Sequence, residues 1–448
     1  MRPSTFIRVL IPIILIGSAV HATHFAYINN FVTNTVAIID TIENKVIGQI
    51  NDPNNTFNRV FFVAITPDGK KAYVANQGYP TPSTVSIVDV ATNTVTGLVN
   101  DPLTTFNGIY SVSISPDGSK MYVLNGGNDT ISIVDVATNT VTGLVKDPQN
   151  IQNNAGLIVF TPDGTKAYEP NHNSSTVGII DVATDTIVSI INDPTHIFQG
   201  PIFSAITPDG TTAYIANYDA PTLVRVNVAT NTILGLVNDP GNTFDHMFYV
   251  AITPDGKTAY IDNFPNNAPG AITISVVDIA SNSVTDVISN PGFREIFYLA
   301  ITSDGKKMFG PNFGAASVSV FDLTNNTVTG TVNDTLLAFN GPYSIALFPA
   351  PQPPRTVIGY ASANVFLLQT DLINVIEWRV PISGPPTKYA IYRNAELTDL
   401  AGEVPSGCPL RFLDYNRKPG ITYTYYLVAV NQYGDTSQPV IVTITARC

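Results

Sequence analysis

One tripeptide returns through most of the chain at an almost constant spacing. Ser303-Asp304-Gly305 continues a series of five Pro-Asp-Gly copies, which begin at Pro67, Pro116, Pro162, Pro208 and Pro254. The successive intervals are 49, 46, 46, 46 and 49 residues. A period in this range indicates one supersecondary unit per repeat, so most of the chain must fold as an array of similar units.

Each repeat contains four short apolar runs with the composition of β-strands. In the first full copy these are Val60–Thr66, Lys71–Asn76, Thr84–Val90 and Thr94–Val99. Val, Ile, Thr and Tyr dominate them, and Gly, Pro, Asn or Asp bound them. No helical periodicity follows the N-terminal segment. Four strands in about 46 residues are typical of one blade of a β-propeller.

Two strand types can be counted along the chain, and each occurs seven times. The second strand of the unit carries Tyr27, Tyr73, Tyr122, Tyr168, Tyr214, Tyr260 or Phe309. The third strand ends at Asp40, Asp89, Asp135, Asp181, Asn227, Asp278 or Asp322. His24–Asn30 is a second strand with no first strand before it, whereas Tyr343–Phe348 is a first strand with no unit after it. We therefore predict an all-β fold: a seven-bladed propeller of four-stranded blades, closed by pairing of the two chain ends.

The repeat resembles a known family. Ala72–Asn76, Val85–Asp89 and Thr92–Val95 look like the YVTN family of β-propeller repeats, and the match recurs in register over residues 24–348. WD40 repeats are excluded, because no Trp-Asp pair occurs and the one tryptophan is Trp378. The resemblance implies an exported or surface protein and brings no set of catalytic residues.

A second domain is expected after the propeller, which we place at residues 23–350. Residues 351–354 form a Pro-rich linker, and residues 355–448 lack the propeller tripeptide. Trp378 lies in an alternating strand, and Tyr423 and Tyr425 stand near the start of a later one. A buried strand tryptophan with such a tyrosine is a β-sandwich pattern. These residues resemble a fibronectin type III domain.

The N-terminus predicts export. Residues 1–22 combine Arg2 and Arg8 with an apolar run, Val9–Val20, and a cleavage site after Ala22. The alternative is an uncleaved anchor, but this run is much shorter than the ~20 residues that span a bilayer. We expect a periplasmic, extracellular or cell-surface protein with no integral membrane segment after cleavage. Because exported chains meet oxidants, Cys408 and Cys448 are expected to form a disulfide.

The charge excludes one class of partner. Asp and Glu outnumber Lys and Arg by 34 to 22, so nucleic-acid binding through a basic patch is not expected. Much of the acidity is repetitive: three sets of six aspartates stand in the Asp-Gly turns, at third-strand ends, and in Asn-Asp-Pro-type loops. Aspartates in such turns accept backbone hydrogen bonds. Calcium binding is an alternative for the loop set, which contains Asp52, Asp101, Asp147, Asp193, Asp239 and Asp334.

Positions that break the repeat are the candidates for function. Arg59 and His246 stand where three other copies have Gly108, Gly200 and Gly341. His172 and His196 add polar side chains to the same class of loop. We predict that Arg59, His172, His196 and His246 lie on the ligand face of the propeller. The histidines are dispersed over separate units, so no metal site is predicted.

Two further breaks lie inside strands of adjacent units. Glu169 replaces an apolar residue of the second strand, and Arg225 replaces one of the third. A buried charge is costly unless it is paired, so we predict a buried Glu169–Arg225 ion pair.

No catalytic motif is recognisable, and neither catalytic residues nor a cofactor are predicted. We favour an exported, non-enzymatic binding protein that presents propeller loops to a protein or glycan partner. One alternative is a propeller enzyme of the lactonase or lyase type, which would use dispersed polar residues of the ligand face. A structural surface-layer component is the other.

Overall fold

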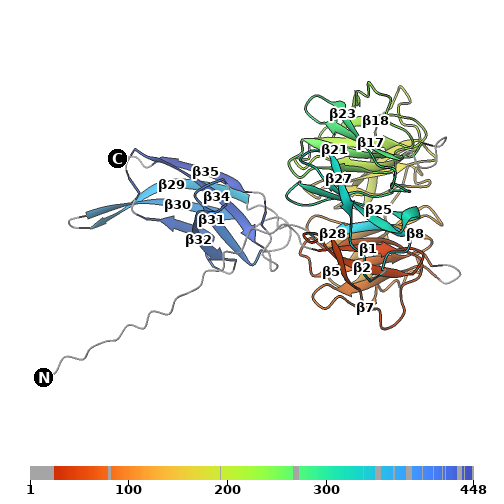
Figure 1. The fold of residues 1–448 in the computed structure, drawn as a ribbon, viewed down its shortest axis with the longest axis horizontal. Helices are drawn as coiled ribbons and strands as arrows, with labels where there is room; N and C mark the ends of the chain where they lie inside the picture. Colours follow the sequence, from red (N-terminus) through yellow and green to blue (C-terminus); the bar gives the residue numbers. More distant parts are fainter. Residues whose placement is uncertain are drawn as a thin grey trace.

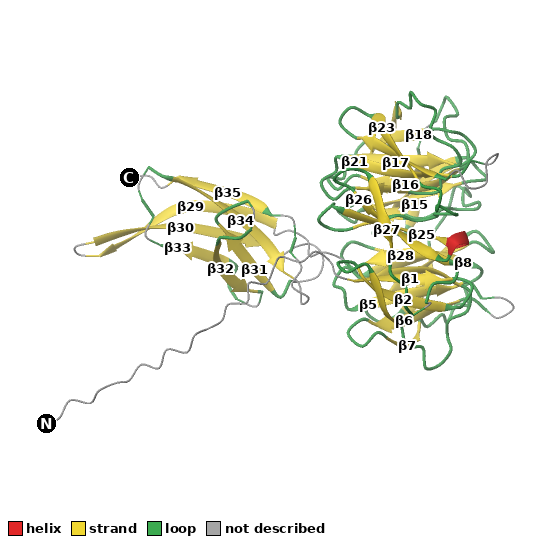
Figure 2. Ribbon diagram, viewed as in Figure 1, coloured by secondary structure: helices red, strands yellow, loops and turns green. Residues whose placement is uncertain are grey.

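The fold consists almost entirely of β-strands (Figure 2). The computed structural model describes residues 25–78, 82–191, 193–265, 272–336, 338–348, 355–366, 369–379, 386–395, 397–406, 408–415, 417–418, 420–430, 436–437 and 439–445. Within them the single helix is the 3-10 turn η1 (Phe313–Ala315), and no helix is long and apolar enough to cross a membrane. The predicted all-β class is confirmed. The predicted signal peptide and the Pro-rich linker lie outside the described residues.

The strands of residues 25–348 form seven four-stranded antiparallel sheets. Sheet 1 contains β4 (Val60–Ile65), β5 (Lys71–Asn76), β6 (Thr84–Asp89) and β7 (Thr94–Leu98). Sheet 2 contains β8 (Ile109–Ile114), β9 (Lys120–Asn125), β10 (Thr130–Asp135) and β11 (Thr140–Leu144). Sheet 3 contains β12 (Val159–Phe160), β13 (Lys166–Asn171), β14 (Thr176–Asp181) and β15 (Thr186–Ile190). Sheet 4 contains β16 (Pro201–Ile206), β17 (Thr212–Asn217), β18 (Leu223–Asn227) and β19 (Thr232–Leu236).

The remaining three sheets complete the set (Figure 1). Sheet 5 contains β20 (Val250–Ile252), β21 (Thr258–Asn263), β22 (Thr273–Asp278) and β23 (Ser283–Ser289). Sheet 6 contains β24 (Ala300–Ile301), β25 (Lys307–Asn312), β26 (Ser317–Asp322) and β27 (Thr327–Thr331). Sheet 7 joins the two ends of this region: β28 (Pro342–Leu347) pairs with β1 (Phe25–Asn30), followed by β2 (Thr35–Asp40) and β3 (Lys45–Gln49).

The first strands of the sheets form a closed ring. Each contacts the first strand of the next sheet, in the order β28, β4, β8, β12, β16, β20, β24 and back to β28. In sheet 7, Tyr27 of β1 lies opposite Ala346 of β28, although more than 300 residues separate the two strands in the chain. The expected pairing of the chain ends is therefore present.

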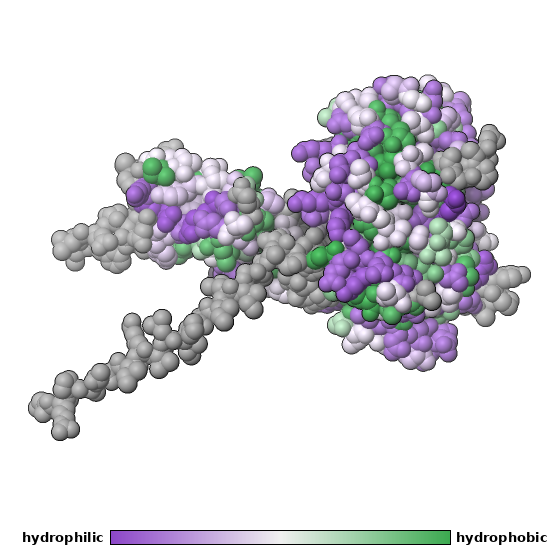
Figure 3. Space-filling model, viewed as in Figure 1, coloured by the Kyte–Doolittle hydropathy of each residue, from purple (hydrophilic) through white to green (hydrophobic). Residues whose placement is uncertain are grey.

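Apolar side chains from both faces of each inner strand fill the space between adjacent sheets. Tyr73 and Ile87 of sheet 1, for example, pack in one buried cluster with Val112 and Met121 of sheet 2. The second and third strands are buried along both faces, which explains why they read as nearly continuous Val, Ile, Ala and Tyr. The outer strands are different. Their outward residues include exposed apolar side chains such as Ile47 and Val188, and Figure 3 shows hydrophobic patches between hydrophilic ones on one side of the molecule.

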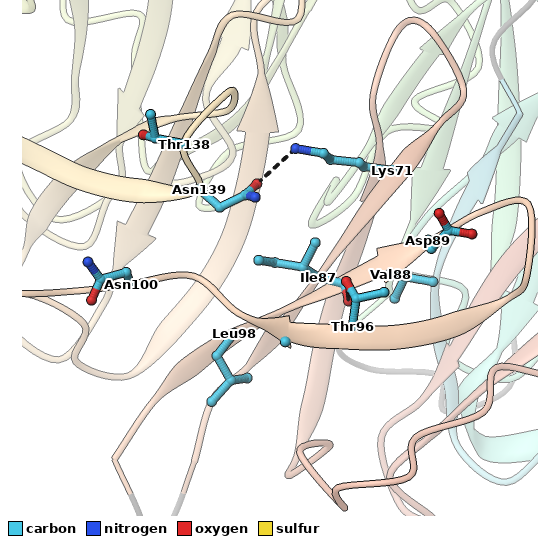
Figure 4. A pocket seen from close by; sticks show the side chains of 10 residues that line it. Lys71, Ile87, Val88, Asp89, Thr96, Leu98, Asn100, Thr138 and Asn139 are labelled. Atoms are coloured by element: carbon cyan, nitrogen blue, oxygen red, sulfur yellow. Dashed lines mark hydrogen bonds between the residues drawn. The ribbon is translucent and has the colours of Figure 1, made fainter.

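A repeated hydrogen bond joins neighbouring sheets, and we call it the inter-sheet clasp. The hydroxyl of Tyr73 in sheet 1 donates to Oδ1 of Asn139, in the turn before β11 of sheet 2, at 2.6 Å. Lys71 Nζ donates to the same oxygen at 3.2 Å (Figure 4). Equivalent clasps join Tyr27 to Asn93, Tyr122 to Asp185, Tyr168 to Asn231, and Tyr260 to Asn326.

The clasp explains why the repeat has a tyrosine in its second strand and an asparagine or aspartate in the turn before its fourth strand. Asn139 has φ of 53°, a left-handed conformation that Asn and Asp tolerate better than other non-glycine residues. Where Phe309 replaces the tyrosine, Lys307 Nζ donates instead to Asn44 Oδ1 at 3.2 Å. Between sheets 4 and 5 the clasp is not made. Asn282 Oδ1, the corresponding acceptor, is buried without a hydrogen-bond partner among the described residues.

The acidic loops carry main-chain hydrogen bonds. Each loop aspartate accepts the N–H of the residue five positions later, as Asp52 Oδ2 does from Phe57 at 2.8 Å; the others are Asp101, Asp147, Asp193, Asp239 and Asp334. Over the described part of the chain, no group of three His, Cys, Asp or Glu side chains could hold a metal ion. Turn chemistry therefore accounts for these aspartates.

Two further sheets follow from residue 355. One has the order β29 (Arg355–Phe366), β30 (Gln369–Arg379), β33 (Arg411–Asp414). The other has the order β32 (Leu400–Pro405), β31 (Lys388–Tyr392), β34 (Thr422–Val430), β35 (Val440–Thr445). Their inner faces share one apolar core, in which the rings of Trp378 and Tyr389 meet edge to face at 5.2 Å.

The clasp makes a testable prediction. Tyr73→Phe removes the donor to Asn139 and should lower the free energy of unfolding by ~0.5–1.5 kcal/mol. Tyr214→Phe is the matched control, because its counterpart Asn282 accepts no such bond and nothing comparable is lost. Urea unfolding of the two variants measures the difference. Equal losses would show that the hydroxyl bond does not contribute.

Candidate functional site

One residue of each sheet stands at the same end of the central ring, and in sheets 1 to 6 it lies six positions before the Pro-Asp-Gly or Ser-Asp-Gly turn. In four sheets the register of the first strand shifts at this residue, as at Phe61 between Val60 and Phe62. Such a bulge re-aims a side chain. The seven bulge-position residues are Phe61, Tyr110, Gly156, Ile202, Phe248, Phe297 and Tyr343.

These side chains converge although they come from different sheets. The ring of Phe61 lies 4.5 Å from Tyr343 and 5.4 Å from Tyr110, measured between centroids. Phe297 lies 5.0 Å from Tyr343 and 5.4 Å from Phe248. Phe61, Tyr110, Phe248, Phe297 and Tyr343 thus form an aromatic arc, which we call the girdle, at this end of the ring of sheets.

The girdle borders an open pocket of about 390 Å³. Its aromatic lining comes from the girdle residues Phe61, Tyr110, Phe248 and Tyr343, together with Tyr218 from the loop after β17. The polar side chains of Asn154 and His172 line the side formed by sheet 3. The volume is within the ~300–1,000 Å³ of small-molecule sites.

Gly156 makes a gap in the girdle on that side. An ideal Cβ at this position would lie 1.8 Å from the Ile202 carbonyl oxygen, so no side chain can be placed without moving the backbone. The N–H of Leu157 donates to the same carbonyl at 3.3 Å. The close approach of sheet 3 to sheet 4 thus excludes a ring here and leaves the polar side chains beside the pocket.

Two histidines flank Tyr218 at the rim. His172 Nε2 lies 3.4 Å from Asp219 Oδ2, and its ring centroid is 5.8 Å from that of Tyr218. On the other side, the His246 ring meets Tyr218 edge to face at 5.0 Å, and its Nδ1 contacts Asp245. Each imidazole is thus oriented by a carboxylate, and each side chain is about a quarter exposed.

Two of the four predicted ligand-face residues are therefore brought together, and two are not. Arg59 lies on the other side of the ring, with its guanidinium 5.1 Å from the Phe31 centroid, where it lines a separate pocket with Gln77 and Asn107. His196 lies exposed in the loop before β16 with φ of 53°. Neither lines the aromatic pocket.

The predicted ion pair between Glu169 and Arg225 is wrong. Both Glu169 carboxylate oxygens and Arg225 Nε are buried without a hydrogen-bond partner among the described residues. Glu169 of β13 lies opposite Gly178 of β14, and its side chain is on the face that packs toward sheet 2. Arg225 lies opposite Tyr214, on the face that packs toward sheet 5.

The reason for this error is the two-residue period of a strand. Glu169 follows the clasp tyrosine Tyr168 directly, so it must point to the opposite face. Arg225 lies opposite Tyr214, which occupies the clasp position of sheet 4 without making the bond, and shares its face. The two side chains therefore point away from each other, although they come from neighbouring sheets.

Glu169 occupies a place where other sheets hold hydroxyl groups. In sheet 1, Ser86 and Thr56 share a hydrogen bond at this site. Sheet 3 has Gly178 and Ile151 at these positions, and a Cβ on Gly178 would lie 3.0 Å from Glu169 Oε2. Burial raises the pKa of Glu169 to about 8; Asp147 adds to the rise, and the Gln152 and Asn171 amides oppose it.

Sequence reasoning missed the girdle and Tyr218. The girdle could have been found in the sequence, because in six sheets its position lies six residues before the Pro-Asp-Gly or Ser-Asp-Gly tripeptide. It was not recognised as a site because a regularly repeated aromatic residue reads as core. Cys408 is exposed and Cys448 lies outside the described residues, so their disulfide stays a prediction.

Comparison with known proteins identifies the fold. No protein-family model matches the chain, and no curated protein matches its sequence. The periplasmic gluconolactonase of Pseudomonas aeruginosa is 15% identical, covers 72% of this chain and 98% of its own, and has a TM-score of 0.54. Kuenenia stuttgartiensis hydrazine synthase is 19% identical, with 65% and 90% coverage and a TM-score of 0.53. The Swd1 β-propeller domain of Myceliophteria thermophila is 11% identical, with 72% and 97% coverage and a TM-score of 0.52.

At these identities the likeness concerns the fold alone. The seven-sheet body of residues 25–348 has a β-propeller fold.

The buried acid gives a prediction for pH dependence. The pKa of Glu169 is raised in the folded state, so the folded chain keeps a proton that the unfolded chain releases above about pH 4.3. Stability should therefore fall as pH rises toward 8, at a rate on the order of 1.4 kcal/mol per pH unit. Glu169→Gln should reduce this slope in urea unfolding between about pH 5 and 8. An unchanged slope would mean that Glu169 is already charged in the fold.

Proposed function

We propose that this chain is an exported, non-enzymatic binding protein that holds a glycan at the mouth of its propeller channel. The observation that carries the proposal is the aromatic pocket. Aromatic rings from several sheets converge on one open site that is also lined by a few polar side chains, Ser111, Asn154 and His172. Such rings stack on the apolar faces of sugar rings, and the Asn154 side chain can bond hydroxyl groups, whereas both ring nitrogens of His172 already contact Asp219 and Asn173.

The propeller is proposed to have seven blades, one for each four-stranded sheet, and to span residues 23–350. Residues 355–448 are proposed to form a fibronectin type III-like module after the 351–354 linker. The two-sheet order and the buried Trp378 support this assignment. A tyrosine also supports it: Tyr425 donates its hydroxyl to Asp414 at 2.7 Å and accepts from Asn374 at 2.8 Å.

Export is proposed from the N-terminal sequence, with cleavage after Ala22. The low charge and the expected Cys408–Cys448 bond suit a protein that works in the periplasm or at the cell surface. The fold is shared with a gluconolactonase described as periplasmic, which is compatible with that location.

A second candidate is hydrolysis of a sugar lactone. The contact between His172 Nε2 and Asp219 at the pocket favours it, because a carboxylate-oriented imidazole can act as a general base through Nδ1 once that atom leaves its contact with Asn173 Oδ1. The fold similarity to a gluconolactonase adds weight. The pocket lining contains no carboxylate, which is why binding is the first proposal.

The binding proposal is tested with the mature chain on a glycan array, followed by calorimetry on the strongest glycan. Tyr110→Ala and Phe248→Ala should each weaken binding up to about tenfold, since an aromatic contact contributes ~0.5–1.5 kcal/mol. Tyr415→Ala is the matched control, because this tyrosine is exposed and lies after β33. Binding that survives both pocket variants would place the glycan elsewhere.

The lactonase candidate is tested by incubating the mature chain with gluconolactone and measuring acid release. If the chain hydrolyses lactones, His172→Asn should abolish turnover, whereas His196→Asn should not, because His196 lies outside the pocket. Turnover no faster than the uncatalysed rate would reject the lactonase candidate and leave the binding proposal standing.

A further inference from the structure

One fully buried acid beside the channel has an oxygen atom without a partner. Asp262 lies in β21 of sheet 5, and its Oδ1 accepts the backbone N–H groups of Phe248 at 2.9 Å and Tyr249 at 2.6 Å. Its Oδ2 is buried and has no hydrogen-bond partner within the described part of the chain. A polar atom buried in this way costs free energy, so its retention needs a physical reason.

The same position in sheet 7 supplies a template. Asn29 Oδ1 accepts the N–H of Ser344 at 2.7 Å, and Ser344 follows the bulge residue as Tyr249 does. Asn29 Nδ2 donates to the Val60 carbonyl of sheet 1, the next sheet around the ring, at 2.7 Å. The other five sheets have apolar residues here: Ala75, Leu124, Pro170, Ala216 and Pro311.

The two side chains therefore correspond in their position in the sheet and in the N–H bond that Oδ1 accepts. Oδ1 accepts the corresponding N–H in both, and Asp262 Oδ2 takes the place of the donating Asn29 Nδ2. The carbonyl that corresponds to Val60 in the next sheet belongs to Ile296, which stands seven residues before the turn as Val60 does. A carboxylate oxygen cannot donate to a carbonyl, but a carboxylic acid can.

We propose that Asp262 is held as the neutral acid, and that its Oδ2 proton is donated to the Ile296 carbonyl as a latch between sheets 5 and 6. Loss of this proton leaves a buried carboxylate facing a carbonyl oxygen. The contact between the two sheets then changes from attraction to repulsion.

The surroundings favour the neutral form. Burial raises the pKa of Asp262 well above its usual range, and the N–H bonds to Oδ1 oppose the rise. The titratable groups that face it are the phenols of Tyr249 and Tyr298, whose pKa values burial also raises. The flanking loops carry four further charged or titratable side chains: Asp245, His246, Arg294 and Glu295.

The latch is connected to the aromatic pocket. Phe248 donates its N–H to Asp262, and its ring lines the pocket. Deprotonation of Asp262 should therefore loosen one wall of the pocket as well as the seam between sheets 5 and 6. The inference does not depend on which ligand the pocket holds.

The test substitutes Asp262 and Asn29 in the mature chain, with Glu169→Gln as background so that the buried Glu169 does not titrate. Urea unfolding is followed from about pH 5 to 9. The background chain should lose stability as pH rises, because the folded state keeps a proton that unfolded aspartic acid releases above about pH 3.9. Adding Asp262→Asn should remove this loss of stability at high pH while keeping the latch, because the amide donates to the carbonyl without titrating. Adding Asn29→Asp instead should create a second pH-dependent loss of stability.

Two results would overturn the proposal. One is an Asp262→Asn variant that keeps the pH slope of the background chain. The other is spectroscopic and does not require the Asn29→Asp variant to fold: near pH 7 the infrared spectrum of the background chain should contain the C=O stretch of a protonated carboxylic acid. That band should vanish on Asp262→Asn, and its absence from the background chain would show that Asp262 is charged.

Discussion

The hydrogen bonding between β28 and β1 is the constraint on which the rest of this propeller depends. Each sheet packs mainly against its two neighbours, so a ring with one incomplete sheet would expose an edge and two apolar faces. Pairing of Tyr27 with Ala346 completes the seventh sheet from the two ends of the region. The region of residues 25–348 can then start with a second strand and finish with a first strand without leaving an open edge.

Closure also explains why the repeat is so regular. Five of the seven seams keep the tyrosine clasp, in which two residues such as Tyr73 and Asn139 are both needed for one bond. Variation is concentrated at the inner ends of the first strands, where the bulge residues point to the channel mouth. This position holds Phe61 in sheet 1 and Gly156 in sheet 3. Both residues are compatible with the fold, and the difference between them shapes the pocket.

The sequence was sufficient for the architecture because strand punctuation and a fixed offset recur in register. Tyr73, the Asp-Gly turns and the unpaired strands at both ends each indicated the ring. Pairwise contacts were harder to predict. Glu169 and Arg225 were matched by charge and by adjacency of their units, but strand alternation turns them to opposite faces. Tyr218 and Asp262 could be interpreted only after the loops and the sheet order were known, because their partners come from other sheets.

The most direct test of the closed ring is hydrogen–deuterium exchange of the mature chain. If β28 completes the seventh sheet, the amides of Ala26–Ile28 and Ile345–Leu347 should exchange as slowly as those of the β4–β5 pair in sheet 1. Fast exchange across residues 342–347, with the other sheets protected, would contradict the account. It would mean that β28 does not pair with β1 and that the ring of sheets is open.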